Sequence, residues 1–356
     1  MPRLFFLAGE ASSDLYASLV ARAARELNPS VSVSGAGGIE MRSSGIELLE
    51  DTSRLGIFGF WEGLGSYPRM HDFLRRMKDH LSAARPDVFV PVSYSGVNLP
   101  LACHARRLGI KVIYISPPQL WAWGHWRART LRQSADKVIC LLPFEEPFFK
   151  SLGVKAMYLG NPLADLLDPY RISQAERGVG SRPAEHGASR SLILMPGSRT
   201  AELRHHRRLL LLVAEQLSEE IPDLAVQEVT LPETAGQGRY RLMARADLII
   251  AASGTATLEA AILRVPLIAI YRLSTISYLL ARVLVRLRHF SLPNIIGNTG
   301  SVPEFLQPDA GQIVACAREL LTSTEKRQGL SDELARIRAL LGPSGAARRI
   351  AEQILE

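Results

Sequence analysis

Residues 192–202, LILMPGSRTAE, decide the fold class of this chain. The apolar run Leu192–Met195 is uninterrupted, as expected for a strand that is buried on both faces. Pro196 and Gly197 then predict a tight turn, and a helical pattern begins at Leu203. A strand, a short turn and a helix form the first part of a βαβ unit, which places its strands in a parallel sheet.

The same order of strand and helix extends along the chain in both directions. We expect further strands at Leu4–Ala8, Val31–Ser34, Val88–Val92, Lys111–Ile115, Lys137–Leu141, Met157–Leu159, Leu248–Ala252 and Leu267–Tyr271. We expect helices at Leu15–Leu27, His71–Ala83, Leu99–Leu108, Leu203–Glu219, Thr255–Leu263, Gln312–Leu321, Thr324–Leu341 and Gly345–Leu355. The sequence therefore predicts the α/β class.

Residues 171–190 separate two such series, because they are rich in Gly, Ser, Ala, Arg and Pro and lack periodicity. We therefore predict a first domain at 1–170, a linker at 171–190 and a second domain at 191–342. The C-terminal helix at 343–356 is a candidate to pack back on the first domain. Each domain is expected to be a Rossmann-like, doubly wound sheet, and the two are expected to face a cleft that holds the ligand.

Composition bounds the function. The 356 residues are 47% hydrophobic and 22% charged, which is a globular composition and excludes a disordered or collagen-like chain. The three cysteines lie far apart without a metal-ligand spacing, so we expect reduced thiols in a cytoplasmic protein and no structural zinc. A net charge of +7 favours anionic partners, namely nucleic acid, phosphorylated substrates or an anionic membrane, although a soluble basic enzyme explains it equally.

No segment reads as a signal peptide or a transmembrane helix. Leu4–Ala8 is too short for a secretory core, and the longest apolar stretch, Leu248–Tyr271, contains Glu259, Arg264 and Pro266. We therefore expect strand, turn, helix and strand in that stretch.

The turn after Met195 is a candidate anion site. Gly197 lets the backbone turn, Ser198 caps the following helix, and Arg199 adds a forked positive charge beside the free amides of the helix start. An ordinary strand–helix turn with a surface arginine is the alternative.

A second turn, ASGTATLE at 252–259, repeats this arrangement. Gly254 permits close approach of the backbone, and Ser253 and Thr255 offer hydroxyl donors to a phosphate. Glu259 lies one turn into the helix, where it can accept hydrogen bonds from ribose hydroxyls. Helix capping by the two hydroxyls is the alternative. Two such turns in one domain suit a nucleotide diphosphate.

The first predicted strand ends in AGEASSD at 8–14. Glu10 follows the carboxyl end of that strand, which faces the crevice in an open α/β sheet, so it is a candidate general base on a sugar hydroxyl. Ser12 is a candidate substrate contact. The alternative is that Ser12, Ser13 or Asp14 caps the helix, and for Asp14 we prefer that interpretation.

Three of the four tryptophans, Trp121, Trp123 and Trp126, fall in one loop that begins with Pro117. Such a loop suits a flat or apolar ligand, such as a sugar face or an acyl chain; core packing is the alternative. Leu55–Leu64 and Tyr278–Phe290 are also apolar. The first suits lipid, a dimer partner or the core, and the second, with its arginines, suits either an anionic bilayer or the core.

Several common motifs are absent: Walker A, GxGxxG after the first strand, GxSxG, HExxH and Asp-x-Asp. We therefore expect a metal-independent mechanism without a cofactor, in which helix dipoles and Arg199 stabilise a leaving diphosphate.

Taken together, these motifs resemble the lipid-A-disaccharide synthase family over nearly the whole chain. The resemblance rests on AGEASSD at 8–14, SGAGGIEM at 34–41, PPQLWAW at 117–123, LLPFEEPFF at 141–149, LGNPLAD at 159–165, MPGSRTAE at 195–202, ASGTATLE at 252–259 and SLPN at 291–294. It implies the GT-B architecture and an inverting transfer from UDP-2,3-diacylglucosamine to 2,3-diacylglucosamine 1-phosphate. The products are a β(1→6) disaccharide and UDP.

The resemblance also assigns residues. Ser198, Arg199, Ser253, Thr255 and Glu259 would hold UDP, and Asn294 matches a residue that the family needs for the donor. Glu10 matches the first motif of the family, and Trp121, Trp123 and Leu55–Leu64 would contact acyl chains. A peripheral protein at the cytoplasmic face of the inner membrane and a homodimer are implied as well.

The chain differs from the family at the position of the expected catalytic base. Ser93 stands where the family usually has an Asp, in a motif close to IDAPDFN, and a neutral serine cannot act as a carboxylate base. Ser13 and Asn161 replace a usual Gly and His. Glu10 therefore takes the role of base, or the chain is a catalytically impaired paralogue that binds a UDP-sugar or lipid. A different GT-B enzyme of UDP-N-acetylglucosamine is a further alternative, and nucleic-acid binding is disfavoured because the arginines are dispersed.

Overall fold

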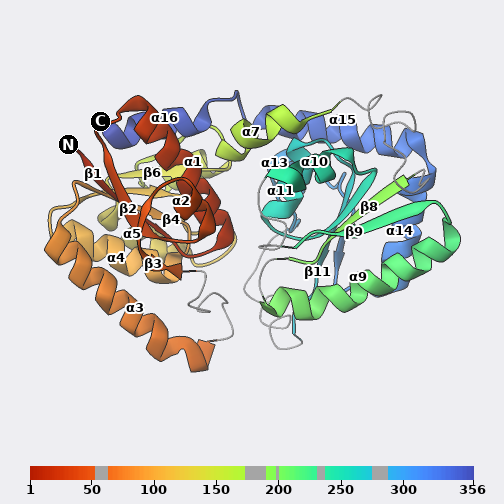
Figure 1. The fold of residues 1–356 in the computed structure, drawn as a ribbon, viewed down its shortest axis with the longest axis horizontal. Coiled ribbons are helices and arrows are strands. Elements are labelled where there is room, and N and C mark those ends of the chain that lie inside the picture. Colours follow the sequence, from red (N-terminus) through yellow and green to blue (C-terminus); the bar gives the residue numbers. More distant parts are fainter. Residues whose placement is uncertain (53–62, 173–189, 198–199, 231–236, 275–287) are drawn as a thin grey trace. The chain divides into compact units, whose positions relative to one another are not determined.

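The computed structural model describes residues 1–52, 63–172, 190–197, 200–230, 237–274 and 288–356 (Figure 1). The chain divides into two compact units. Unit 1 combines Met1–Asp165 with Gly342–Glu356, and unit 2 spans Leu166–Leu341. Each unit contains a parallel sheet covered by helices, which confirms the predicted α/β class.

Unit 1 is built on a seven-stranded sheet with the order β3-β2-β1-β4-β5-β6-β7. Its strands are β1 Arg3–Ala8, β2 Ser32–Gly37, β3 Glu47–Asp51, β4 Val88–Val92, β5 Lys111–Ile115, β6 Lys137–Cys140 and β7 Ala156–Tyr158. All neighbouring strands pair in parallel. Strand β4 is buried along its whole length, which explains its unbroken apolar sequence.

The helices of unit 1 follow the strands in the expected βαβ order. They are α1 Ala11–Leu27, α2 Ile39–Ser43, α3 Gly63–Ala84, α4 Ser95–Arg107, α5 Ala128–Ser134, α6 Glu145–Ser151 and α16 Ala346–Leu355, with the 3₁₀ turn η2 at His125–Arg127. Helix α7, Pro162–Leu167, lies where the chain passes from unit 1 to unit 2.

The C-terminal helix α16 packs against α1, far away in sequence (Figure 1). Asp165 accepts hydrogen bonds from the backbone N–H groups of Gly345 at 2.6 Å and Ala347 at 2.8 Å, so it caps the amino end of α16. Arg349 donates to the carbonyl of Leu159 at 2.9 Å. These polar contacts fasten the end of the chain to unit 1.

Unit 2 contains a five-stranded parallel sheet with the order β12-β11-β10-β8-β9. Its strands are β8 Arg190–Met195, β9 Leu224–Glu228, β10 Leu248–Ala252, β11 Leu267–Tyr271 and β12 Glu304–Leu306. Its helices are α9 Thr200–Glu220, α10 Gln237–Arg245, α11 Thr255–Ile262, α13 Leu292–Gly297, α14 Ala310–Thr322 and α15 Thr324–Leu340, with the 3₁₀ turn η3 at Asp168–Tyr170. Helices α9 and α14 pack together on one face of the sheet, and α11, α13 and α15 pack on the other (Figure 1).

No helix in the part of the chain that the structure describes is both long and apolar enough to cross a bilayer. The apolar stretch Leu248–Tyr271 forms β10, α11 and β11, as predicted. Residues 173–189 of the predicted linker lie outside the described residues, and β8 begins at Arg190.

Candidate functional site

The two predicted anion-binding turns of unit 2 follow neighbouring strands. Strands β8 and β10 pair directly, with Met195 opposite Ala251, at the ends where the two turns begin. The sheet continues from β8 to β9 on one side and from β10 to β11 on the other. The turns therefore flank the topological switch point, which is where open α/β sheets bind ligands.

The turn after β8 is held by His206 of α9. This side chain is fully buried, and its Nδ1 lies 2.9 Å from the carbonyl oxygen of Pro196. Its Nε2 accepts a hydrogen bond from the backbone N–H of Arg272 at 2.9 Å. Because Nε2 is the acceptor, Nδ1 carries the proton and donates to Pro196. The neutral ring thus ties the β8–α9 turn to the end of β11.

Gly197 has a φ of 112°, a conformation that favours glycine. Ser198 and Arg199, the two charged or hydroxylated candidates of this turn, lie outside the described residues. His206 has no sequence signal that marks this role, because it lies within a run of polar helical residues without a motif.

The turn after β10 leaves room beside its glycine. Gly254 has a φ of 153°, and a Cβ built there would meet no heavy atom of the described residues within 4 Å. Thr255 begins α11 and is partly exposed. Ser253 donates its hydroxyl proton to the carbonyl of Phe290 at 2.7 Å, so its oxygen remains available as an acceptor. The open space at Gly254 is where a ligand could approach the backbone closely.

Glu259 of α11 is buried and paired with Arg239 of α10. Its Oε1 lies 2.5 Å from Nη2 of Arg239. Burial raises the pKa of Glu259, and Arg239 opposes that shift. The guanidinium also lies over the ring of Tyr240, with Cζ 4.7 Å from the ring centroid. Glu259, the residue predicted to bind the ribose, therefore has one carboxylate oxygen occupied by Arg239, a partner that no sequence motif indicated.

Asn294 of α13 is fully buried and binds backbone. Its Nδ2 donates to the carbonyl of Val302 at 2.9 Å, and its Oδ1 accepts from the N–H of Val302 at 3.0 Å. This two-point contact holds the connection between α13 and β12. Glu304 of β12 similarly accepts from the N–H groups of Ser291 at 2.8 Å and Phe290 at 3.1 Å. The SLPN motif therefore forms a rigid segment next to the β10–α11 turn.

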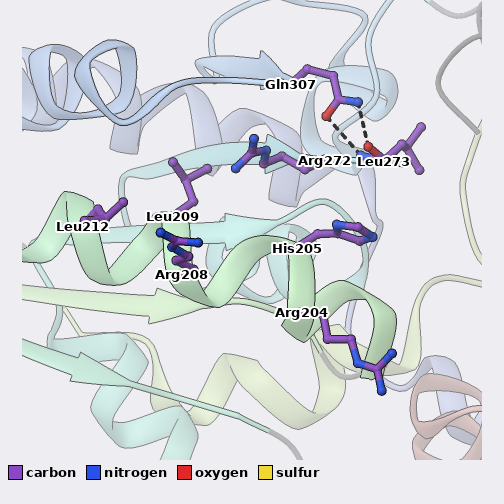
Figure 2. Close-up of a pocket in the computed structure, with 8 residues that line it drawn as sticks. All are labelled: Arg204, His205, Arg208, Leu209, Leu212, Arg272, Leu273 and Gln307. Atoms are coloured by element: carbon purple, nitrogen blue, oxygen red, sulfur yellow. Dashed lines mark hydrogen bonds between the residues drawn. The ribbon is translucent and has the colours of Figure 1, made fainter. Parts of the chain in front are cut away.

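A pocket of 590 Å³ lies between α9 and the segments that follow β11 and β12. Figure 2 shows its lining residues: Arg204, His205, Arg208, Leu209, Leu212, Arg272, Leu273 and Gln307. Gln307 holds Leu273 through two hydrogen bonds of 3.1 and 2.8 Å with its backbone. Three arginines beside leucines give this pocket both positive charge and apolar surface. None of its residues was predicted as a site residue.

Unit 1 has an equivalent switch point between β1 and β4. These strands pair with Ala8 opposite Val92, so Glu10 and Ser93 follow neighbouring strand ends. Glu10 is the N-cap of α1 and forms a capping box with Ser13, whose Oγ accepts from the N–H of Glu10 at 2.9 Å. The structure thus brings Glu10, the candidate base, and Ser93, which stands where the family usually has an Asp, to the carboxyl ends of adjacent strands. Ser12 lies in the first turn of α1 and is partly exposed.

Asp14 has a capping role, but the prediction that it caps its own helix, α1, is wrong. It accepts from the N–H groups of Gly38 at 2.7 Å, Glu40 at 2.8 Å and Met41 at 3.2 Å. It therefore caps α2 instead of its own helix. Burial raises the pKa of Asp14, and these hydrogen bonds oppose that shift.

Ser93 and Tyr94 both have positive φ angles, 53° and 43°. Each such non-glycine residue costs about 1–3 kcal/mol of backbone strain. The carbonyl of Ser93 accepts from Nδ2 of Asn98 at 2.8 Å and from the hydroxyl of Tyr114 at 2.8 Å. Burial, together with the nearby charge of Glu10, raises the pKa of Tyr94 to about 12. The strained pair is therefore fixed beside Glu10.

The tryptophan loop is anchored to α6 through a buried carboxylate. Trp121 donates Nε1–H to Oε1 of Glu145 at 3.0 Å. Oε2 of Glu145 accepts from the N–H groups of Leu141 at 3.2 Å and Leu142 at 3.1 Å. Burial raises the pKa of Glu145 to about 7, although all three hydrogen bonds favour the carboxylate.

The other two tryptophans of the loop differ in their surroundings. The guanidinium of Arg127 lies over Trp123, with Cζ 4.1 Å from the ring centroid. Trp126 is 73% exposed. Trp126 is therefore the most exposed ring of the loop, whereas Trp121 and Trp123, the two predicted contacts, are partly buried and also contact protein groups. Most of Leu55–Leu64 and of Tyr278–Phe290 lies outside the described residues.

Two Rossmann-like domains with parallel sheets define the GT-B fold, and solved structures share this architecture. The S. aureus MnaA-UDP co-structure has a TM-score of 0.68 at 11% identity, covering 99% of this chain and 96% of that one. UDP-GlcNAc 2-epimerase from Neisseria meningitidis bound to UDP-GlcNAc has a TM-score of 0.68 at 13% identity, with 100% of both chains covered. MurG from Acinetobacter baumannii has a TM-score of 0.58 at 15% identity over 100% of this chain and 99% of that one.

The sequence itself identifies the family. The profile described as Lipid-A-disaccharide synthetase matches residues 4–237 and 230–349. Lipid-A-disaccharide synthase of Nitrosococcus oceani is 35% identical over 372 residues, which cover 99% of this chain and 95% of the relative. The enzyme of the same name from Myxococcus xanthus is 33% identical over 375 residues, covering 100% of this chain and 97% of the relative. The chain belongs to the lipid-A-disaccharide synthase family, which confirms the resemblance drawn from its motifs.

Proposed function

We propose that this chain is the hexosyltransferase that joins UDP-2,3-diacylglucosamine to 2,3-diacylglucosamine 1-phosphate in lipid A assembly. The observation that carries the proposal is the pairing of β8 with β10, which sets two short turns side by side at the switch point of unit 2. The open space beside Gly254 supports close approach of a diphosphate to the backbone there.

The reaction needs one bond formed and one broken. The acceptor 6-hydroxyl oxygen attacks the anomeric carbon of the donor, the bond from that carbon to the diphosphate oxygen breaks, and UDP leaves with the bonding electrons. The attack inverts the anomeric configuration. We assign Gly197, Ser198, Arg199, Ser253, Gly254 and Thr255 to the diphosphate, where the amino ends of α9 and α11 and the guanidinium stabilise the developing charge without a metal.

Two further residues are assigned to the donor side with different roles. Glu259 would receive the ribose through the carboxylate oxygen that Arg239 does not occupy. Asn294 would act through the backbone that it holds, because its amide binds Val302.

Glu10 is our candidate for the base that accepts the proton of the 6-hydroxyl. It lies next to the strained Ser93–Tyr94 pair, and Ser93 has no carboxylate to serve in its place. Ser93 would then contact the acceptor through its hydroxyl, and Ser12 would do so from the first turn of α1. The tryptophan loop, with Trp121 and Trp123, would line the acyl chains on the acceptor side.

UDP release from the two lipid substrates tests the proposal. The wild-type chain should release UDP, and Glu10→Gln should lower kcat by about 10²–10⁴-fold, the usual contribution of a general base. Glu26→Gln, at an exposed position near the other end of α1, is the matched control and should leave kcat unchanged. A correctly folded wild-type protein that releases no UDP would reject the assignment.

We further propose that the chain is a homodimer and a peripheral protein at the cytoplasmic face of the inner membrane. The net charge of +7 and the arginine–leucine pocket on α9 support attraction to anionic lipid. Sedimentation with phosphatidylglycerol vesicles tests the membrane assignment, and light scattering tests the dimer.

Ser93 favours a second candidate, a catalytically impaired paralogue that binds a UDP-sugar or lipid. In that case the wild type binds UDP without turnover, and Ser93→Asp creates activity. Turnover by the wild type at a rate that Ser93→Asp does not raise would exclude this alternative.

A further inference from the structure

Arg127 packs closely against two other residues of the tryptophan loop, Trp123 and Gly124. Its guanidinium stacks on Trp123 with Cζ 4.1 Å from the ring centroid. On the next residue, Gly124, an added Cβ would lie 2.8 Å from Nε and 2.9 Å from Nη2 of Arg127. Gly124 also has a φ of 77°, which other residues rarely adopt. The loop therefore depends on a glycine both for its turn and for the space that the guanidinium fills.

The same guanidinium reaches the amino end of α4. Nη1 of Arg127 lies 3.2 Å from Oγ of Ser95, the first residue of that helix. The next residue, Gly96, is exposed, and in the part of the chain that the structure describes a Cβ built there would meet no heavy atom within 4 Å. Arg127 is thus directed toward the amino end of α4, which carries a partial positive charge. Val97 and Asn98 donate their N–H groups to the carbonyl of Tyr94, whereas Ser95 and Gly96 have no such bond among the described residues.

No acidic residue among those that the structure describes forms an ion pair with Arg127. Its Nε is buried and donates to no acceptor there. Burial lowers the pKa of Arg127, in keeping with a cation that lacks a compensating carboxylate. The guanidinium as a whole is only partly buried, and among the described residues its hydrogen-bond acceptor is Ser95. The exposed part of a cation held in this way is suited to an anion from outside the chain.

We propose that Arg127 binds the phosphate monoester of the acceptor sugar. The forked guanidinium offers two parallel N–H donors to phosphate oxygens, and the amino end of α4 offers backbone N–H groups to the same dianion. Arg127 lies in unit 1, which also contains Glu10, and this inference rests on the proposed function for the identity of the acceptor. It makes Arg127 the residue that distinguishes a phosphorylated acceptor from an unphosphorylated one.

The test compares two short-chain acceptors, diacylglucosamine 1-phosphate and the same sugar without phosphate, in the full-length protein. Arg127→Ala should raise KM for the phosphorylated acceptor by about 10- to 100-fold, the loss expected for a charge-assisted hydrogen bond in a partly buried site. KM for the UDP-linked donor and UDP affinity should stay at the wild-type values. With the unphosphorylated acceptor, Arg127→Ala and wild type should perform alike.

Arg127→Lys keeps the charge but loses the fork, so it should recover only part of the affinity. Arg129→Ala is the matched control, because Arg129 is exposed on the adjoining helix α5. Arg127→Ala with unchanged KM for the phosphorylated acceptor would overturn the inference, as would an equal loss with both acceptors. If Arg127→Ala fails to fold, as judged by lost UDP binding, Arg127→Lys carries the same comparison.

Equilibrium binding of the phosphorylated acceptor without donor separates this inference from the proposed function. A protein without turnover whose affinity for the sugar phosphate still depends on Arg127 would reject the transferase assignment and keep the phosphate site. Inorganic phosphate as a competitor distinguishes recognition of the phosphate alone from recognition of the whole acceptor. Absence of any difference between wild type and Arg127→Ala in this assay would reject the site itself.

Discussion

Replacement of His206 by phenylalanine tests how the donor-side turn is held. Phenylalanine keeps a ring of similar size in the same buried space but removes both hydrogen bonds. The carbonyl of Pro196 and the N–H of Arg272 would each lose a partner that lies 2.9 Å away. A buried polar group left without a partner costs about 1–3 kcal/mol, so the two together predict a loss of about 2–6 kcal/mol in the free energy of unfolding.

The loss should appear first as a lower Tm. For a unit of this size, a loss of 1 kcal/mol lowers Tm by about 2–4 °C, so the variant should melt at least about 4 °C below wild type. Calorimetry should also show weaker UDP binding, because the β8–α9 turn is no longer tied to the end of β11. The neighbouring residue His205 is exposed, so His205→Phe is the control for stability and should leave Tm almost unchanged. Wild-type Tm and UDP affinity in His206→Phe would refute the reasoning.

Two further predictions concern the turn after β10 and the tryptophan loop. Gly254→Val should weaken UDP binding measured by calorimetry by at least about tenfold, because the side chain strains a φ of 153° and fills the open space beside the turn. Gly329→Ala is its control, because Gly329 is exposed in α15 and an added Cβ would meet no heavy atom of another described segment within 4 Å. This control should bind UDP normally, and equal affinities for all three proteins would contradict the role of the turn. For Glu145, the folded-state pKa of about 7 lies above the usual value of 4.5, so the folded protein holds a proton that the unfolded chain releases. The stabilisation from this group is therefore present below pH 4.5, and the free energy of unfolding falls by about 3 kcal/mol as the pH rises to 7. Glu145→Gln should abolish this trend in Tm measured from pH 5 to 8. Parallel curves of Tm against pH for the two proteins would contradict the raised pKa.

The interior strands were predictable because their burial leaves a local signal. Val88–Val92, Lys111–Ile115, Leu248–Ala252 and Leu267–Tyr271 have the bounds that the apolar runs predicted. The edge strand β3 was missed because Glu47, Glu50 and Asp51 break its apolar pattern, and β9 and β12 likewise are edge strands with polar residues. Helix α1 begins earlier than predicted, at Ala11, because Glu10 and not Asp14 provides its cap.

The sequence by itself determined the α/β class, the family and the turns that lie at the carboxyl ends of strands. These features depend on residues close together in the chain, where periodicity and turn chemistry act directly. Only the tertiary structure decided the partners of the buried and partly buried polar groups: Asp14 caps α2, His206 joins Pro196 to Arg272, and Arg127 donates to Ser95. A buried polar group must find a hydrogen-bond partner wherever packing brings one, and packing joins residues that the sequence keeps far apart.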